Sequence, residues 1–418
     1  MAQLTDDCFA VGAPILTVDE AVALIRERVA PVAGVETVAL VDADGRVLAD
    51  DILAAMSVPR TDNSAVDGYA VRHADLALSG ETVLPVRGRV AAGQNAGGIS
   101  AEGVAVRIFT GAPMPPFADT VFMQEDVRLD GDAVVLPSGL PPGANRRRAG
   151  EDIEAGDVVA RAGQRLHPQH LALATAVGLQ SLAVRRRLRV ALFSTGDELA
   201  EPGGPLGAGM IHDSNRVMLI ALLRRLGAET RDHGILRDDP DLVAQRLSAA
   251  SAEADLLVTS GGVSVGEEDH VKAAVERIGR LDLWRLAIKP GRPVAMGTVA
   301  GVPFVGLPGN PVAAYVTCLM LLAPLLARLG GADGAPPLSL PVRAAFSRRK
   351  KRGRREFVRV TLRVGADGQA ELVPFPRDGA ALMSSLIGSD GLAEIPDDAT
   401  SVCEGDLLRF HPHAALQG

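Results

Sequence analysis

The sequence predicts a multidomain protein of the α/β plus β class, with one doubly wound, mostly parallel α/β domain and further domains built mainly from β-strands. Between residues 187 and 331, strand-like apolar runs alternate with amphipathic helices, a pattern typical of a parallel sheet covered on both faces. Residues 57–149 and 332–418 contain short strand-like runs between Gly, Pro and Asp turns. With 418 residues, 47% of them hydrophobic, the chain can bury several cores, which excludes a mainly disordered protein.

Residues 1–56 and 150–186 are predicted to be mixed α/β segments. Thr17 and Glu20 form a capping-box pattern before apolar residues at helical spacing. A second helix is expected around Ala172 and Ala176. The later segment could rejoin the first, in which case residues 57–149 would form an inserted β domain. The strands expected in that domain are 82–86, 104–109, 120–124 and 133–136.

The α/β region ends at a Gly- and Pro-rich linker near residue 331, after which strand-like patterns return. Its expected strands are 189–193, 255–259, 283–288, 294–296 and 302–306, and its expected helices are 217–226, 271–278 and 312–327. The C-terminal strands are expected at 338–342, 357–363, 371–374 and 407–410. The basic run at 348–355 has two interpretations: a solvated hairpin turn or part of an anion-binding surface.

The composition argues against several functional classes. Lys and Arg number 43 and Asp and Glu 51, so the net charge is 43 − 51 = −8, and aromatic residues are only 3%; nucleic-acid binding is therefore not expected. The longest apolar run, 312–327, is shorter than a membrane span and is expected to be a buried helix. Three widely spaced cysteines and an acidic N-terminus without a basic leader predict a cytoplasmic protein.

Loops rich in Gly, Pro and acidic residues follow the strands of the α/β region, at 194–198, 213–215, 237–240, 260–269, 289–293 and 306–311. Each loop alone has a structural interpretation; Asp213 or Ser214, for example, could cap a helix. Together they predict one site, because the carboxyl ends of parallel strands meet at the same edge of a sheet. The candidate binding residues in these loops are Ser194, Thr195, Gly196, Asp197, Asp213, Ser214, Asn215, Gly261, Gly262, Ser264 and Arg292.

Acidic and basic side chains in the same loops indicate the chemistry. Lys289 and Arg292 could bind a phosphate or a tetrahedral oxyanion, and glycine N–H groups can approach one closely. Carboxylates would repel such an anion unless a cation lay between them, so they predict a hard metal such as Mg²⁺ or another divalent cation. The proposed metal ligands are Glu198, Asp238 and Asp269. This arrangement suits phosphoryl or nucleotidyl transfer.

Seven motifs in the same order resemble the MoeA family of molybdopterin molybdenumtransferases, which includes the E domain of gephyrin. They are DNSAVDGYA at 62–70, TGAP at 110–113, GED at 150–152, STGDEL at 194–199, SGGVSVG at 260–266, KPG at 289–291 and LPGNP at 307–311. The resemblance implies a cation-dependent enzyme that takes adenylylated molybdopterin and molybdate, inserts molybdenum and releases AMP. It also implies an inserted β domain, a C-terminal β-barrel and an elongated homodimer whose cleft is shared between subunits.

The resemblance further assigns individual residues. It implies that Glu198, Asp238, Asp269 and Lys289 act in the α/β domain, that Asp62, Thr110 and Asp152 contribute from the first two domains, and that Pro308 and Pro311 shape the rim. Close relatives carry Lys where this chain has Arg285, which keeps the charge but changes its reach and hydration. The molybdopterin adenylyltransferase is a candidate partner.

Three alternative functions remain at this point. The α/β domain could form the adenylylated pterin rather than consume it, as a molybdopterin adenylyltransferase does. The chain could act mainly as a gephyrin-like dimeric scaffold, or it could handle tungstate, an oxyanion of nearly the same size as molybdate.

Overall fold

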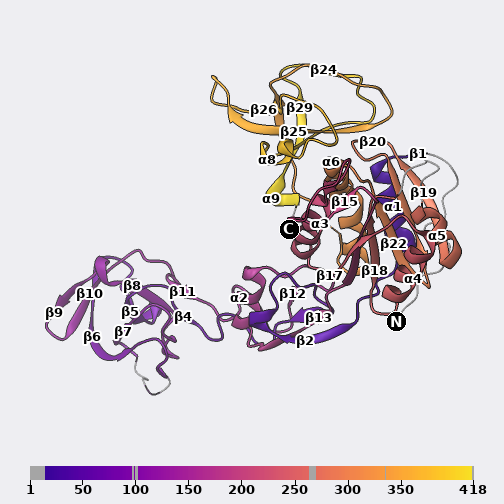
Figure 1. Ribbon diagram of the computed structural model, residues 1–418. Helices are drawn as coiled ribbons and strands as arrows, with labels where there is room; N and C mark the ends of the chain where they lie inside the picture. The colour runs from indigo at the N-terminus through magenta and orange to yellow at the C-terminus, as the bar shows by residue number, and fades with distance from the viewer. Residues whose placement is uncertain (1–14, 97, 99–101, 263–269, 335, 417–418) are drawn as a thin grey trace.

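The computed structural model describes residues 15–96, 98, 102–262, 270–334 and 336–416, and it has four parts (Figure 1). An α/β domain and a β-barrel lie together at one end, and a small mixed domain adjoins the α/β domain. A separate β domain extends away from these three parts. The polypeptide is therefore elongated.

The α/β domain is built on a seven-stranded sheet with the order β1-β19-β21-β22-β18-β14-β17. These strands are β1 (Ile15–Leu16), β14 (Arg189–Thr195), β17 (Glu229–Leu236), β18 (Leu256–Ser260), β19 (Gly279–Leu286), β21 (Pro293–Val299) and β22 (Val302–Leu307). The pairs β1–β19, β22–β18, β18–β14 and β14–β17 are parallel, and β19–β21 and β21–β22 are antiparallel. The prediction of a mostly parallel sheet is confirmed.

Helices cover both faces of this sheet because successive strand residues point to opposite sides. Val190 and Leu192 of β14 join a core with helices on one face, whereas Ala191 and Phe193 join a core on the other. The first face is covered by α1 (Val18–Arg28), α3 (Ser214–Arg225), α6 (Pro311–Thr317), the π-helical η4 (Cys318–Leu322) and α7 (Ala323–Leu329). The second is covered by α4 (Pro240–Ser251) and α5 (His270–Ile278).

The continuous helix formed by α6, η4 and α7 is apolar enough, over Pro311–Leu329, to cross a membrane by length and composition. In this protein, however, 78% of its most apolar window is buried against the sheet and neighbouring helices. The expectation of a buried helix at 312–327 is confirmed.

The strand β1 and the helix α1 pack with the α/β domain, whereas the sequence analysis grouped these residues with the mixed domain. β1 pairs with β19, and Val18, Ala21 and Ile25 of α1 enter the same core as Leu325 of α7. The predicted capping box is present: the Thr17 hydroxyl accepts from the Glu20 N–H at 3.2 Å, and the Glu20 carboxylate accepts from the Thr17 N–H at 2.8 Å. The apolar face of α1 determines where the helix packs, although the residues that follow it in sequence belong to the mixed domain.

The mixed domain joins two distant stretches of chain. β2 (Val35–Ala39) pairs antiparallel with β13 (Ser181–Arg185), and β3 (Ile52–Leu53) pairs with β12 (Val158–Ala160). The domain also contains η1 (Leu40–Asp42) and α2 (Pro168–Ala176). The β domain therefore lies between its two halves in sequence. Val58 and Ile153 form an isolated bridge where the chain leaves and re-enters.

The β domain contains a six-stranded sheet with the order β8-β5-β7-β6-β10-β9. The strands are β5 (Gly68–Val71), β6 (Glu81–Val90), β7 (Ala105–Ile108), β8 (Thr120–Met123), β9 (Arg128–Asp130) and β10 (Ala133–Pro137). A short pair, β4 (Asn63–Ser64) with β11 (Arg146–Arg147), and the turns η2 (His73–Asp75) and η3 (Gln124–Asp126) complete the domain. The four predicted strands correspond to β6, β7, β8 and β10.

The C-terminal domain is a closed barrel, as the family resemblance implied. Its strands are β23 (Leu340–Ala344), β25 (Arg355–Val364), β26 (Ala370–Pro374), β27 (Gly391–Ile395) and β29 (Leu407–Pro412). The pairing β25–β27 closes the series β25-β26-β23-β29-β27 into a ring. Its remaining elements are β24 (Arg348–Arg349), β28 (Ser401–Val402), α8 (Ser384–Ile387) and α9 (His413–Leu416). The strand β20 (Ile288–Lys289), which follows β19, pairs with β25 and so connects the two domains.

Candidate functional site

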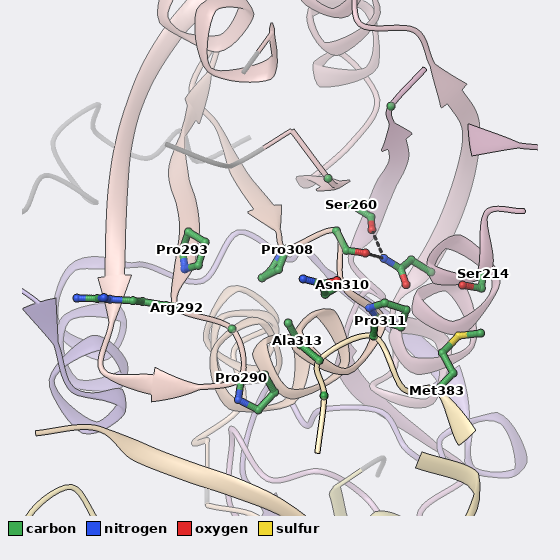
Figure 2. A pocket seen from close by; sticks show the side chains of 18 of the residues that line it. Ser214, Ser260, Pro290, Arg292, Pro293, Pro308, Asn310, Pro311, Ala313 and Met383 are labelled. Atoms are coloured by element: carbon green, nitrogen blue, oxygen red, sulfur yellow. Dashed lines mark hydrogen bonds between the residues drawn. The ribbon is translucent and has the colours of Figure 1, made fainter. Parts of the chain in front are cut away.

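A cleft of about 1020 Å³ lies where the loops of the α/β sheet meet the barrel. Its walls come from the loops after β14, β17, β18, β20 and β22, from the start of α3, and from barrel residues around β25. Figure 2 shows Pro290, Pro308 and Pro311 gathered in this cleft, with Ser214 and Met383 at one side and Arg292 extending away from the prolines. The cleft is large enough for a cofactor-sized ligand.

Two carboxylates come from neighbouring loops. Glu198 follows β14, and its carboxylate lies over the Cα of Gly196, where a Cβ would overlap it. Asp238 follows β17, and its carboxylate accepts a hydrogen bond from the Asp197 N–H at 3.2 Å. The Asp238 N–H in turn donates to Asp197 at 3.3 Å. These reciprocal bonds hold the two loops together, with Glu198 and Asp238 facing the cleft.

The start of α3 is connected to two other loops. Asp213 caps the helix by accepting from the Arg216 N–H at 3.1 Å, so its structural interpretation is correct. The Asn215 amide donates to Ser260 Oγ at 3.0 Å and to the Gly309 carbonyl at 2.7 Å (dashed lines, Figure 2). Its other atom, Oδ1, is buried without a hydrogen-bond partner. Asn215 therefore ties the start of α3 to the loops after β18 and β22.

Glycines allow the loops after β14 and β18 to approach closely. Gly261 has φ +93°, and a Cβ there would come within 2.6 Å of the Thr195 carbonyl. Gly262 has φ +66° and is packed against Val271 and the Thr195 hydroxyl. A side chain at either position would push these two walls of the cleft apart.

Lys289 comes from the connection between the two domains. Its backbone belongs to β20, where it lies in register with Glu356 of β25. Its Nζ lies 3.7 Å from Glu356 Oε2, and the side chain is 45% exposed and lines the cleft. The ammonium therefore forms an ion pair with the barrel and is still accessible to a ligand in the cleft.

The barrel contributes cleft residues that the loop analysis missed, among them Arg348, Glu356, Arg359 and Asp378. Arg359 is buried and donates to Ser385 Oγ at 3.1 Å; this burial lowers its pKa. Arg348 donates to both carboxylate oxygens of Asp378, at 2.8 and 3.2 Å. Burial acts to raise the pKa of Asp378, but the hydrogen bonds from Arg348 and the nearby charges lower it overall. The basic run containing Arg348 was the one sequence signal for this wall.

Other predicted residues lie elsewhere. Ser194 is buried behind the cleft and Asp197 lies outside its lining, and Arg285 is exposed on β19, opposite Pro293. Asp269 and Ser264 lie outside the described residues. Among the described residues, the cleft lining therefore includes Glu198, Asp238 and Lys289 but not Ser194, Asp197 or Arg285.

Asp62, Thr110 and Asp152 lie in or next to the β domain and do not line this cleft within one chain. Asp62 accepts from the Ala149 N–H at 2.8 Å. The Thr110 hydroxyl donates to Asp67 at 2.8 Å. Asp152 borders a separate hollow of about 450 Å³.

A divalent cation would find suitable donor types here. Glu198 and Asp238 provide the carboxylate oxygens that Mg²⁺ prefers. Over the part of the chain that the structure describes, no group of three His, Cys, Asp or Glu side chains is close enough to hold a metal ion. The third expected ligand, Asp269, is not in that part. The two described carboxylates fit a cation by their chemistry.

Three family models together match most of the chain. The MoeA N-terminal region (domain I and II) matches residues 16–178, a probable molybdopterin binding domain matches 191–328, and the MoeA C-terminal region (domain IV) matches 341–412. The first two models contain the loops that carry the candidate site residues, and the third contains the barrel wall of the cleft.

Individual relatives agree with these matches. A molybdopterin molybdenumtransferase of Haemophilus influenzae is 39% identical over 406 residues, which cover 97% of this chain and 100% of the relative. Molybdopterin molybdenumtransferase 2 of Mycobacterium tuberculosis is 39% identical and covers 89% of this chain and 94% of its own length. A solved molybdopterin biosynthesis MoeA protein of Pyrococcus horikoshii aligns with a TM-score of 0.82 and 28% identity, covering 96% of this chain and 100% of that protein. The chain belongs to the MoeA family.

Proposed function

We propose that this protein transfers molybdenum from molybdate to adenylylated molybdopterin and releases AMP. The names of its relatives and the match to a molybdopterin-binding domain support this function over the adenylyltransferase and scaffold alternatives. One structural observation supports it most directly: Glu198, Asp238 and Lys289 line the same cleft. Carboxylates and a cation at one site suit a reaction in which two anionic substrates must meet.

The residues of the cleft divide into two groups in this mechanism. Glu198 and Asp238 would hold a divalent cation, which when bound neutralises charge on the phosphoanhydride and eases its cleavage by water. Lys289 binds the anionic substrate from the opposite wall. Asn215 holds the loops after β18 and β22 in place through its hydrogen bonds to Ser260 and Gly309. Catalysis then comes mainly from positioning and electrostatics.

The proposed enzyme is a cytoplasmic homodimer in which the β domain of one subunit completes the cleft of the other. The position of the β domain, far from the cleft of its own chain, supports this arrangement (Figure 1). Asp62, Thr110 and Asp152 would then act across the subunit boundary. Titration of the protein with molybdate and with tungstate would show which oxyanion it binds more tightly.

The function is tested by mixing the purified protein with adenylylated molybdopterin, Mg²⁺ and molybdate and following AMP. Glu198→Gln should reduce turnover at least about 100-fold, because it removes a charge from the cation site. Glu253→Gln is a matched control: that carboxylate is exposed, pairs with Arg231 and precedes β18 at the opposite edge of the sheet. AMP release at the wild-type rate by Glu198→Gln would reject its role, and formation of adenylylated pterin from ATP and molybdopterin would favour the adenylyltransferase.

A further inference from the structure

We propose that Glu356 is a positioning residue that holds Lys289 and Arg348 beside each other as a two-cation site for an oxyanion, so that the barrel contributes Arg348 as a binding residue. The identification of the oxyanion as molybdate rests on the proposed function. The two-cation site itself rests on the contacts of these three side chains, which come from two domains.

Glu356 is a buried carboxylate at the junction of the barrel and the α/β domain, with 2% of its surface exposed. Its Oε1 accepts from Arg354, at 3.0 Å from Nε and 2.7 Å from a terminal nitrogen. Its Oε2 has no hydrogen-bond partner but lies 3.7 Å from Lys289 Nζ and 3.6 Å from Arg348. One carboxylate oxygen is thus hydrogen-bonded within the barrel, and the other faces two cations at the cleft.

The charges explain why this carboxylate is needed. Lys289 and Arg348 repel each other, and the other carboxylate bonded to Arg348, Asp378, is exposed, so solvent screens its attraction. Glu356 Oε2 attracts both cations. Because this carboxylate is buried, its attraction is screened less than that of a surface group. Both cations line the cleft. Their remaining N–H groups can therefore bind one tetrahedral anion together.

Arg348 is held in place from a second side. Its guanidinium has five N–H groups, and two of them donate to the exposed carboxylate of Asp378. The side chain of Arg348 is only 21% exposed, so its plane is fixed between Glu356 and Asp378. A fixed guanidinium with unused donors is suited to binding an oxyanion with two parallel hydrogen bonds.

The first test is calorimetric titration of the full-length protein with sodium molybdate at constant ionic strength. Arg348→Met should weaken binding at least about tenfold, because it removes charge-assisted hydrogen bonds. The matched control is Arg349→Met, the next residue of β24, which is exposed and does not line the cleft. Its affinity should equal that of the wild type. Equal affinities for both variants would overturn the proposal.

Glu356→Gln separates positioning from simple charge. The substitution removes a negative charge near the cleft, so if Glu356 were merely a counter-charge the anion should bind more tightly. If Glu356 positions the cations, molybdate affinity should fall about tenfold. The NH₂ group of the glutamine must face either Arg354 or the pair Lys289 and Arg348, and it cannot accept a hydrogen bond from either. The KM for molybdate should rise similarly while kcat changes little. Tighter binding would refute the positioning role, and should this variant not fold, Arg348→Met still decides the binding site.

The two proposals fail separately. If the wild type binds molybdate through Arg348 but releases no AMP from adenylylated molybdopterin, the proposed function is wrong and the two-cation site stands. If AMP is released but Arg348→Met binds molybdate normally, the function stands and the two-cation site is wrong.

Discussion

Lys289 is the residue at which the two halves of the cleft meet. Its ammonium is exposed to the cleft while its backbone is held in β20 beside Glu356. Lys289→Ala should weaken molybdate binding by about tenfold or more, since it removes one of two cations. Calorimetry measures this, with Lys272→Ala on α5 as the control because that lysine is outside the cleft. Unchanged binding by Lys289→Ala would contradict the assignment.

The sequence identified one wall of the cleft at residue level and missed the other. Glu198, Asp238 and Lys289 were predictable because each lies in a loop after a strand of one sheet, and such loops share an edge. Glu356 lies between the basic run and the strand expected at 357–363, so it attracted no prediction. Its role depends on pairing with a strand 67 positions earlier, from Lys289 to Glu356 (356 − 289 = 67). No local pattern reveals such a pairing.

The basic run illustrates the same limit. Most of the run at residues 348–355 is structural, and its anion-binding interpretation stays a prediction. Lys350 is buried and donates to the carbonyls of Pro396 and Ala399 at 2.6 and 2.9 Å. Arg355 donates to Asp19 at 2.7 Å and thereby ties the barrel to α1. Among these residues, Arg348 lines the cleft.

At the scale of elements, the starts of β14 and β18 are held by Asp255. Its buried carboxylate accepts from the Arg189 N–H at 2.7 Å and from the Arg186 guanidinium at 2.8 and 3.0 Å. Asp255→Asn should lower the free energy of unfolding by about 2 to 3 kcal/mol at pH 7, because it leaves these donors without a charged acceptor. Urea unfolding measures the difference.

The same carboxylate predicts a pH dependence. Burial acts to raise the pKa of Asp255, but the hydrogen bonds from Arg186 and Arg189 lower it overall. A carboxyl whose pKa is lower in the folded state contributes its full stability above its unfolded pKa, near 3.9, and loses it as the pH falls through the folded value. The gap between wild type and Asp255→Asn should therefore be constant from pH 7 to about 5 and shrink below about pH 4. A gap that persisted at pH 2 would contradict this account.

The loop after β20 depends on a glycine that packs against α6. Gly291 has φ +107°, and a Cβ would overlap the Thr317 hydroxyl and lie 3.3 Å from the Ala313 carbonyl. Gly291→Ala should cost about 1 to 3 kcal/mol and displace the loop that follows Lys289. Gly309→Ala is the control, because its Cβ would meet only the Gly261 Cα, at 3.8 Å. Equal thermal stability of the two variants would show that Gly291 is not required.

Most elements were predictable from periodicity, and the exceptions have a common physical cause. The ranges expected from apolar runs or helical spacing overlap the strands β6, β7, β8, β10, β14, β18, β19, β21 and β22 and the helices α1, α2, α3, α5, α6 and α7. The strand β17 and the helix α4 were not expected, because β17 has no apolar run. The position of α1 was not predictable, because its apolar face fits the core beside α7. Two-residue strands such as β20 could not be predicted either, because two residues are too few to show an alternation of apolar and polar side chains.

At the scale of the whole molecule, the distance between the β domain and the cleft makes a prediction about assembly (Figure 1). In a dimer with shared clefts, Asp62→Asn and Glu198→Gln would each inactivate both sites. A heterodimer of the two variants would retain one intact site. Randomly reassembled mixtures should therefore recover about a quarter of the wild-type activity, as half the dimers carry one good site of two. No recovery, in mixtures shown to exchange subunits, would show that each cleft takes both residues from the same chain.

The overall architecture was only partly accessible from the sequence. Alternating strands and helices predicted the doubly wound domain, but patterns of short strands do not show whether a sheet closes. Closure of the barrel depends on the pairing of β25 with β27, which brings together residues such as Phe357 and Glu394. The family resemblance supplied that expectation.

The two-residue strand β20 has a consequence for dissecting the protein. A fragment ending at the linker near residue 331 would keep the seven-stranded sheet and its helices, yet the backbone of Ile288 and Lys289 would lose its partners in β25. The lysine would then lie on an untethered loop. Excising the C-terminal domain should thus abolish anion capture without unfolding the remainder, and the barrel is better regarded as half of the binding apparatus than as an accessory module.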